Sequence, residues 1–312
     1  MATRLTILGS YAKALVVTAD RIPLSGETLL GRDYRETYGG KGSDMAVQAA
    51  RLGAEVSFIG VVGDDNLGRE FGELMAAEGV DTTGLRVAAE RNTGVGLIIK
   101  DTAGANIIVV DMGANELFDD SDLEASKAAI VGADTVLAQL EIPLETVLHG
   151  LAMAKAAGVR TVLNPAPAID LTSVDLGCVD ILTPNETEAR VLLGLAPDDP
   201  TPNAEIASRI LKLGCRAVVM TLGEKGTAAY AADPEFTETL TPAWAIEVVD
   251  SNGAGDSFNA ALCTALGEGQ GLAQAVRFAA ATAALCCTDW ETVPSYHHRA
   301  QVEEFMNKAE EH

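Results

Sequence analysis

A glycine-rich segment near the C-terminus combines a carboxylate with free backbone amides. Residues 250–258 read DSNGAGDSF, follow the strand-like residues IEVV and precede a helix-like apolar stretch. A turn of small residues that enters a helix exposes N–H groups at the positive end of the helix dipole. Asp256, in the first turn, could accept a proton from a hydroxyl while the amides bind a developing anion. An ordinary first-turn acid fits the same pattern, so this segment alone leaves both interpretations open.

A lysine between glycines forms a second candidate site. Residues 39–44 read GGKGSD, without the long glycine loop and the Ser or Thr after the lysine that a P-loop has. The glycines on either side of Lys41 instead suit a hinge at which the backbone approaches a ligand, with Lys41 contributing a charge or a hydrogen bond. A plain turn before a helix is the alternative.

A third segment, TPNETE from Thr183, follows an apolar strand-like run and opens a helix. Asn185 and Glu188 are three residues apart, so on a helix they share a face and could together hold a hydrated Mg²⁺. A capping box, with Asn185 as the N-cap, explains the same spacing.

Short apolar runs alternate with amphipathic helical stretches through most of the chain. The predicted strands begin at Leu5, Val56, Asp134, Arg160, Val179 and Ala217. Between them lie stretches such as SDMAVQAARLG, a predicted helix with Ser43 as its capping residue that stops at Gly53. This alternation predicts an α/β fold with three layers, in which a doubly wound, mostly parallel sheet lies between helices.

Two segments break the alternation. TGVGLIIK from Thr93 and ANIIVVDMG from Ala105 flank the turn DTAG, which predicts a β-hairpin. Residues 11–38 also lack helical periodicity. We predict that residues 11–38 and 93–112 form a small second sheet, and that residues 1–10, 39–92 and 113–312 form the main α/β domain.

These segments, in this order and at these separations, resemble the ribokinase-like or PfkB family of carbohydrate and nucleoside kinases. Residues 39–68 are similar to the N-terminal signature of that family, and residues 250–260 to its C-terminal signature. Shorter similar segments begin at Gly26, Thr93, Met112, Gln139, Leu163, Thr183 and Thr221. The resemblance implies that the small sheet is a lid over a sugar, and that the γ-phosphate of ATP is transferred to a primary hydroxyl.

The resemblance also implies a role for individual residues. Asp256 is implied to be the catalytic base, with an anion hole formed by Gly253, Ala254 and Gly255. Mg²⁺ would be organised by Asn185 and Glu188. Residues implied to border the nucleotide are Asn185, Thr221, Gly223 and Gly226. Residues implied to face the substrate are Gly40, Lys41, Asp44 and Glu141.

The sequence departs from the family pattern around the sugar. Ribokinases grip sugar hydroxyls with an asparagine and an aspartate on the first lid strand, and here the matching substrate-facing positions are Ala12 and Ala14. Asp44 stands where the family has an asparagine. We therefore expect an acceptor other than ribose.

A loop near the C-terminus departs as well. Many relatives form a monovalent-cation site from the equivalents of Asp250, the Ser251 carbonyl and a glycine-containing loop. That loop reads DWETVPS here, with Glu291 in place of the glycine. Binding of K⁺ at Asp250 is left open, and so is a homodimer formed through the lid.

Three functions compete. The leading one is an ATP-dependent phosphotransferase that acts on a sugar or sugar derivative. A nucleoside kinase is the alternative, because Ala12 and Ala14 could make room for a base. A non-catalytic ligand-binding protein is disfavoured, because binding alone does not require Asp256, Asn185 and Glu188 together with the glycine turn.

The composition limits the partners. A formal charge of −23 argues against binding to nucleic acid or to an anionic membrane, since both would be repelled. The sequence shows neither a long apolar span nor a secretory signal, so we expect a cytoplasmic protein. The 5 cysteines lack zinc-site spacing and are expected to be reduced.

Overall fold

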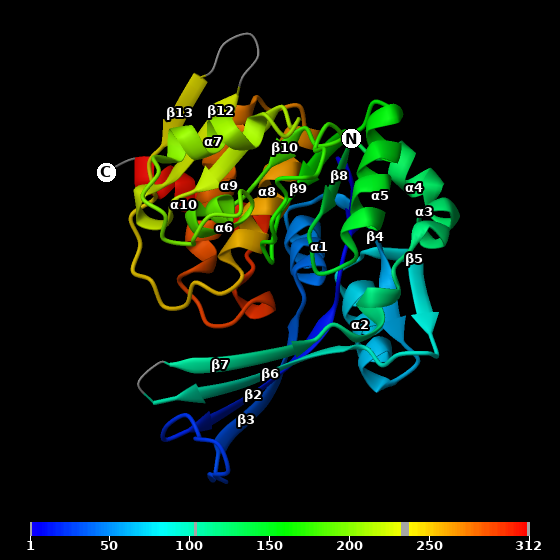
Figure 1. The fold of residues 1–312 in the computed structure, drawn as a ribbon, viewed down its shortest axis with the longest axis vertical. Coiled ribbons are helices and arrows are strands. Elements are labelled where there is room, and N and C mark those ends of the chain that lie inside the picture. The colour runs from blue at the N-terminus through cyan, green and yellow to red at the C-terminus, as the bar shows by residue number, and fades with distance from the viewer. Residues whose placement is uncertain (1, 103–104, 232–236, 311–312) are drawn as a thin grey trace.

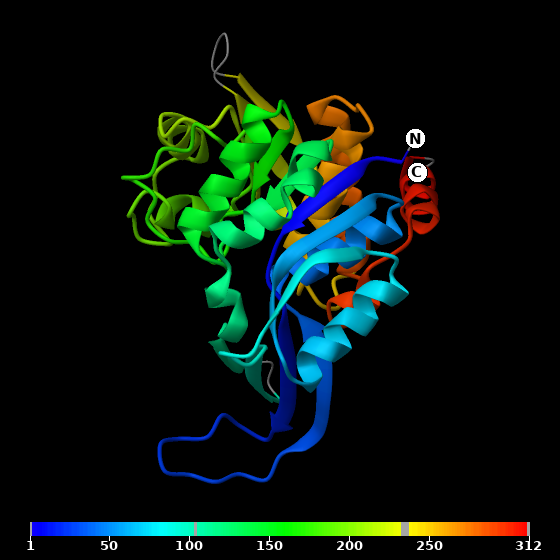
Figure 2. The same ribbon diagram turned by 90° about the vertical axis from the view of Figure 1, so that its right-hand side faces the viewer.

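A computed structural model of the chain describes residues 2–102, 105–231 and 237–310. It contains a 9-stranded sheet in the main body and a separate 4-stranded sheet that projects from it (Figure 1). Figure 2, turned by 90°, shows the same projection from the side.

The large sheet is mostly parallel, as predicted. Its strand order is β13-β12-β11-β10-β9-β8-β1-β4-β5, and only the β11–β12 and β12–β13 pairs are antiparallel. The six predicted strands are all present, and the sheet also contains β5, β12 and β13. The strands are β1 (Arg4–Leu8), β4 (Glu55–Gly63), β5 (Asp81–Ala88), β8 (Thr135–Ala138), β9 (Arg160–Leu163), β10 (Ile181–Leu182), β11 (Ala217–Thr221), β12 (Thr227–Ala231) and β13 (Thr237–Thr241).

Helices cover both faces of this sheet, which confirms the predicted three layers. One apolar cluster packs against α1 (Lys41–Arg51), α2 (Asn66–Ala77), α8 (Ala254–Gly267), α9 (Leu272–Cys286) and α10 (Arg299–Glu310). The other packs against α3 (Asp120–Ala125), α4 (Lys127–Gly132), α5 (Leu144–Ala156), α6 (Glu186–Val191) and α7 (Asn203–Leu211). Short 3₁₀ turns are η1 (Gly113–Leu117), η2 (Gly223–Lys225) and η3 (Val293–Ser295). Among the described residues, none of the helices has the length and hydropathy to span a membrane.

The small sheet has the order β3-β2-β6-β7. Its strands are β2 (Ala12–Ala19), β3 (Arg32–Gly39), β6 (Gly94–Asp101) and β7 (Asn106–Asp111). The predicted hairpin is confirmed by the antiparallel β6–β7 pair, although residues 103–104 of its turn lie outside the described residues. The parallel β2–β6 pair joins the two halves of the sheet. Treating this sheet as a separate domain stays a prediction.

The start of α1 differs from the prediction. The helix begins at Lys41, and Ser43 is not its N-cap: the Ser43 hydroxyl donates hydrogen bonds to the carbonyls of Gly39 (2.8 Å) and Gly40 (3.1 Å). The capping position belongs to Gly40, whose φ is +90°. A Cβ there would lie 2.7 Å from the Cα of Tyr11, so only glycine fits where β3 leads into α1.

Candidate active site

Two of the polar residues singled out from the sequence, Glu141 and Asn185, lie at one edge of the large sheet together with Ser10. Ser10 follows β1, Glu141 follows β8 and Asn185 follows β10, so all three lie past the carboxyl ends of parallel strands. Open α/β sheets bind their ligands at this edge.

A cavity of about 260 Å³ lies between this edge and the small sheet. Lys41, Asp44, Glu141 and Asp256 line it from the main body. Besides Tyr38, the small sheet contributes alternate residues, which must share one face of each strand. These are Ala12, Ala14 and Val16 on β2, Arg35, Thr37 and Gly39 on β3, Gly96, Ile98 and Lys100 on β6, and Asn106, Ile108 and Val110 on β7.

The N-terminus of α8 supplies unpaired amides. The N-cap is Gly253, with φ at +77°, and a Cβ there would lie 2.6 Å from the Tyr296 hydroxyl. The amides of Gly255 and Asp256 have no hydrogen-bond partner among the described residues, as expected in the first turn of a helix. Ala254 donates its N–H to the Ser251 carbonyl at 3.3 Å. The two unpaired amides can therefore bind an anion.

Asp256 is buried beside these amides, and its Oδ1 has no hydrogen-bond partner among the described residues. Burial raises the pKa of Asp256 to about 6. The ammonium group of Lys41 opposes this shift, whereas the carboxylates of Glu141 and Glu188 add to it. A carboxyl group with a pKa just below neutrality is well suited to act as a general base.

Asp44 and Lys41 set the charge around Asp256. Asp44 is buried, and its pKa is raised well above its ordinary value by burial and by the charges of Asp256 and Glu141. The pKa of Lys41 is raised chiefly by Asp256, and Glu141 adds to this effect. Lys41 is therefore a permanent cation among carboxylates.

Glu141 fixes the start of α1. Its Oε2 accepts hydrogen bonds from the Ser10 hydroxyl (2.6 Å) and from the Lys41 N–H (2.8 Å). Gln139 donates to Ser10 at 3.0 Å and accepts from the amide of Glu141. Glu141 thus positions Lys41 as well as lining the cavity.

Asn185 and Glu188 form the capping box that the sequence left as an alternative. The Asn185 side chain accepts from the Glu188 N–H and the Glu188 Oε2 accepts from the Asn185 N–H, both at 2.8 Å. Glu188 Oε1 has no hydrogen-bond partner among the described residues. Burial raises the pKa of Glu188, and Lys41 opposes this. The cap therefore leaves one carboxylate oxygen for a hydrated cation, which suits Mg²⁺ because that ion keeps several waters.

The chain matches the description "pfkB family carbohydrate kinase" over residues 2–299. It belongs to this family. Ribokinase from Haemophilus influenzae is 37% identical over 309 residues, which cover 99% of this chain and 100% of that protein. Deoxyribokinase from Salmonella typhimurium is 29% identical and covers 97% of this chain and 98% of its own length. Arabidopsis thaliana ribokinase, solved with ribose and ATP, superposes with a TM-score of 0.88 at 31% identity, covering 98% of this chain and 99% of that one.

These comparisons confirm the predicted family and fold. The protein is a carbohydrate kinase, a phosphotransferase with an alcohol group as acceptor. The non-catalytic alternative is thereby set aside.

The residues predicted to face the nucleotide in this kinase include Thr221, Gly223 and Gly226, and none of these three lines the cavity. Thr221 ends β11 and forms a bridge with Asn185, which places it beside the capping box. Gly223 is exposed with open space around it, whereas a Cβ on Gly226 would lie 2.1 Å from the Thr241 carbonyl. Packing of the β11–β12 turn therefore explains Gly226 without a nucleotide.

Asp250, the candidate ligand for a monovalent cation in this kinase, lies against the C-terminal loop. Its Oδ1 accepts from the Asn252 N–H (3.0 Å) and its Oδ2 from the Glu291 N–H (3.3 Å). The Ser251 carbonyl accepts from Ala254. These bonds hold the turn in place and leave K⁺ binding open.

The sequence did not single out several residues that line the cavity of this kinase. Thr292 lines it and donates to the Tyr38 carbonyl at 3.2 Å. Arg35 and Lys100 face it from β3 and β6. Alternate residues of a strand share one face, so counting back by twos from Gly39 along β3 identifies Arg35 as a cavity residue. Nothing in the sequence places Thr292 at the cavity.

Proposed function

We propose that this kinase transfers the γ-phosphate of ATP to a hydroxyl of a sugar or sugar derivative other than ribose. The observation that carries the proposal is the juxtaposition of a buried carboxylate oxygen without a partner and two amides without partners. A hydroxyl that enters the cavity can donate to Asp256 Oδ1, while the phosphoryl group that it attacks lies against the amides.

The chemistry follows from these residues. Asp256, ionised at neutral pH, accepts the proton as the hydroxyl oxygen forms its bond to phosphorus. The amides of Gly255 and Asp256 stabilise the charge on the transferred group, and Lys41 balances the carboxylates nearby. Mg²⁺, held through water by Asn185 and Glu188, would neutralise the phosphates of ATP when bound.

The class of acceptor is inferred from the residues of the small sheet that line the cavity. Ala12 and Ala14 line the cavity with methyl groups, which cannot grip a polyhydroxylated ring. Asp44, Lys41 and Glu141 supply polar groups on the opposite side. The relatives named above are ribokinases and a deoxyribokinase, so ribose is the first acceptor that must be tested against the proposal.

A screen of acceptors tests this. Ribose, deoxyribose, hexoses, polyols and nucleosides are compared by kcat/KM with ATP, so that the nucleoside-kinase alternative is tested as well. We expect ribose to be poor, and we expect Ala12→Asn with Ala14→Asp to raise ribose activity while lowering activity on the preferred acceptor. If the unaltered kinase prefers ribose to every other compound, the acceptor proposal is wrong and the kinase assignment survives.

We also propose that a second copy of the chain covers the outer face of the small sheet. Leu97 (52% exposed), Ile107 (44%) and Val109 (61%) alternate with cavity residues, so they point away from the cavity. Two chains of charge −23 repel each other over most of their surfaces, and the apolar patch formed by these residues of β6 and β7 lets them meet without adding like charges there.

A further inference from the structure

Glu291 has a backbone conformation that favours glycine. Its φ is +71°, and among the described residues only Asp33 is another non-glycine residue with positive φ. The left-handed region costs free energy for residues with a Cβ, and residues held there commonly serve a function. The contacts of the Glu291 side chain therefore indicate what its function is.

That side chain reaches the small sheet. Glu291 Oε1 lies 3.1 Å from Arg35 Nη1, and Arg35 is on the cavity face of β3. The exposed fractions of the two side chains are 45% for Arg35 and 23% for Glu291, and both line the cavity. A different ion pair, Lys13–Glu70 at 2.8 Å, joins β2 to α2, with the Lys13 side chain buried. The Arg35–Glu291 pair instead crosses between the small sheet and the C-terminal loop.

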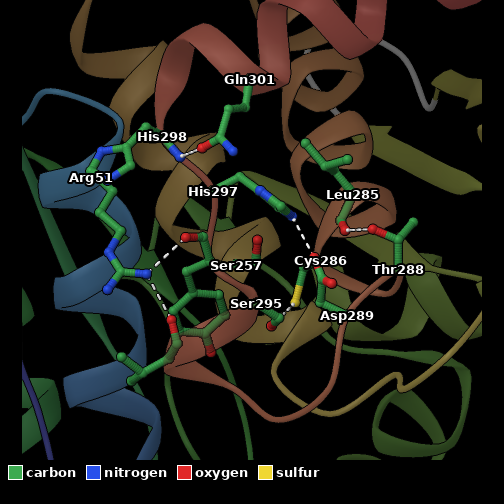
Figure 3. Close-up of polar contacts among 12 residues, drawn as sticks. Arg51, Ser257, Leu285, Cys286, Thr288, Asp289, Ser295, His297, His298 and Gln301 are labelled. Atoms are coloured by element: carbon green, nitrogen blue, oxygen red, sulfur yellow. Dashed lines mark hydrogen bonds and ion pairs between the residues drawn. The ribbon is translucent and has the colours of Figure 1, made fainter.

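The loop that carries Glu291 is anchored to the main body (Figure 3). Arg51 of α1 donates to the carbonyls of Val293 (2.7 Å) and Tyr296 (2.8 Å). His297 Nε2 lies 3.2 Å from Asp289 Oδ2, so the two ends of the loop are in contact. The two Arg51 hydrogen bonds and the bond from the Glu291 N–H to Asp250 hold this loop against the main body, so Arg35 contacts a residue that is anchored there.

We propose that Arg35 and Glu291 form a latch that positions β3 across the cavity and sets the outer limit on acceptor size. This role rests on the proposed function, because it assumes that the acceptor lies between the small sheet and Asp256. The two side chains position the sheet and take no part in proton or phosphoryl transfer.

The expected strength of the latch follows from its exposure. A partly exposed ion pair changes an equilibrium by about two- to fivefold, enough to shift the fraction of molecules in which the sheet is closed. Closure acts on acceptor binding, so loss of the latch should raise the acceptor KM and leave kcat nearly unchanged.

The most informative variant is Glu291→Gly. Glycine relieves the backbone cost and keeps the N–H that Asp250 accepts, so this variant should fold at least as well as the wild type. We expect hydrogen exchange of the β2 and β3 amides, measured without substrates, to rise about two- to fivefold. We also expect acceptors larger than the preferred one to gain kcat/KM relative to it.

A charge exchange tests the contact itself. Arg35→Glu and Glu291→Arg, made singly, should each accelerate exchange in β2 and β3, and the double variant should return it to within about twofold of the wild type. Arg32→Glu is the matched control, because Arg32 is on the same strand with 48% side-chain exposure and pairs with Asp20, the residue that follows β2. It changes the charge without touching the latch.

Additive effects of the two single substitutions, with no recovery in the double variant, would overturn the latch. So would unchanged exchange and an unchanged acceptor range in Glu291→Gly. Hydrogen exchange is measured without an acceptor, so it tests the latch independently of the acceptor screen. Unchanged exchange would contradict the latch alone, and a preference for ribose in the screen would contradict the proposed acceptor alone.

Discussion

At the scale of single residues, burial and charge explain why Asp256 is suited to its proposed role. Its carboxylate is surrounded by protein, lacks a hydrogen-bond partner for Oδ1 and lies near other acids. These features raise its pKa, and Lys41 limits the rise. An aspartate on the surface at the start of a helix would be solvated, so its pKa would not be raised in this way.

Asp256→Asn should lower turnover by about 10²-fold or more, the range for loss of a positioned base, while the affinity for ATP changes little. Steady-state kinetics and nucleotide titration provide the measurements. Turnover near that of the wild type would show that another group takes the proton.

The same substitution should stabilise the protein at high pH. The pKa of Asp256 is about 6 in the folded chain and near 3.9 when unfolded, so the folded state is favoured by protonation. Stability is therefore lost as the pH rises from about 4 to 6, by up to about 3 kcal/mol. We expect Asp256→Asn to unfold at higher denaturant concentration than the wild type at pH 8, with the difference shrinking towards pH 4. No difference at pH 8 would contradict the raised pKa.

Glu188 has both a structural and a proposed metal-binding role, which its variants can separate. Glu188→Gln keeps a side-chain acceptor for the Asn185 N–H but removes the charge, so the cap should survive while the Mg²⁺ concentration for half-maximal activity rises several-fold. Glu186→Gln, which removes a charge in the same helical turn, is the control. An unchanged Mg²⁺ titration with a lower melting temperature would leave Glu188 as a cap alone.

At the scale of elements, the start of α8 depends on one glycine. In Gly253→Ala the new Cβ would lie 2.6 Å from the Tyr296 hydroxyl, at a backbone φ that alanine disfavours. We expect a loss of about 1 to 3 kcal/mol of stability, together with reduced turnover as the amides shift.

Gly255→Ala is the matched control for stability. Nothing lies within 4 Å of its Cβ position, and alanine favours helix, so the free energy of unfolding should not fall. Equal destabilisation by the two substitutions would show that the turn tolerates no side chain at all.

Elements with a strong apolar pattern could be predicted from the sequence, and those without one could not. Strands such as β8, whose residues are all buried, can be predicted because a strand covered on both faces forms a mostly apolar run in the sequence. β13 reads TETLT and is largely exposed at the edge of the sheet, so it carries no apolar signal. The predicted N-cap at Ser43 is wrong because the Ser43 hydroxyl donates to a carbonyl, whereas an N-cap side chain accepts from an amide.

The candidate site divides in the same way. Asp256 and Lys41 stand in local motifs, and a motif can be read without knowing the fold. The Arg35–Glu291 contact joins residues near opposite ends of the chain, so only the folded structure can bring it to light.

At the scale of the whole molecule, the acidic charge restricts which surfaces of two copies can meet. Leu97→Glu with Val109→Glu should shift the kinase to monomers in analytical ultracentrifugation, because carboxylates would enter the proposed contact. Val87→Glu, at another exposed apolar residue (60% exposed), is the control and should leave the association unchanged. A wild-type chain that sediments as a monomer at all concentrations would rule out this contact.

The pairing of β2 with β6 also governs how the chain can be built. β2 aligns with β6 along its whole length, from Ala12 opposite Gly94 to Ala19 opposite Asp101. A ribosome releases β2 and β3 first, and an isolated two-stranded hairpin is marginally stable in water. The backbone N–H and C=O groups along the β6 edge of β2 stay unpaired until β6 has been synthesised, after α1, β4, α2 and β5. The wall that the small sheet contributes to the cavity is therefore completed only after β6 has paired with β2.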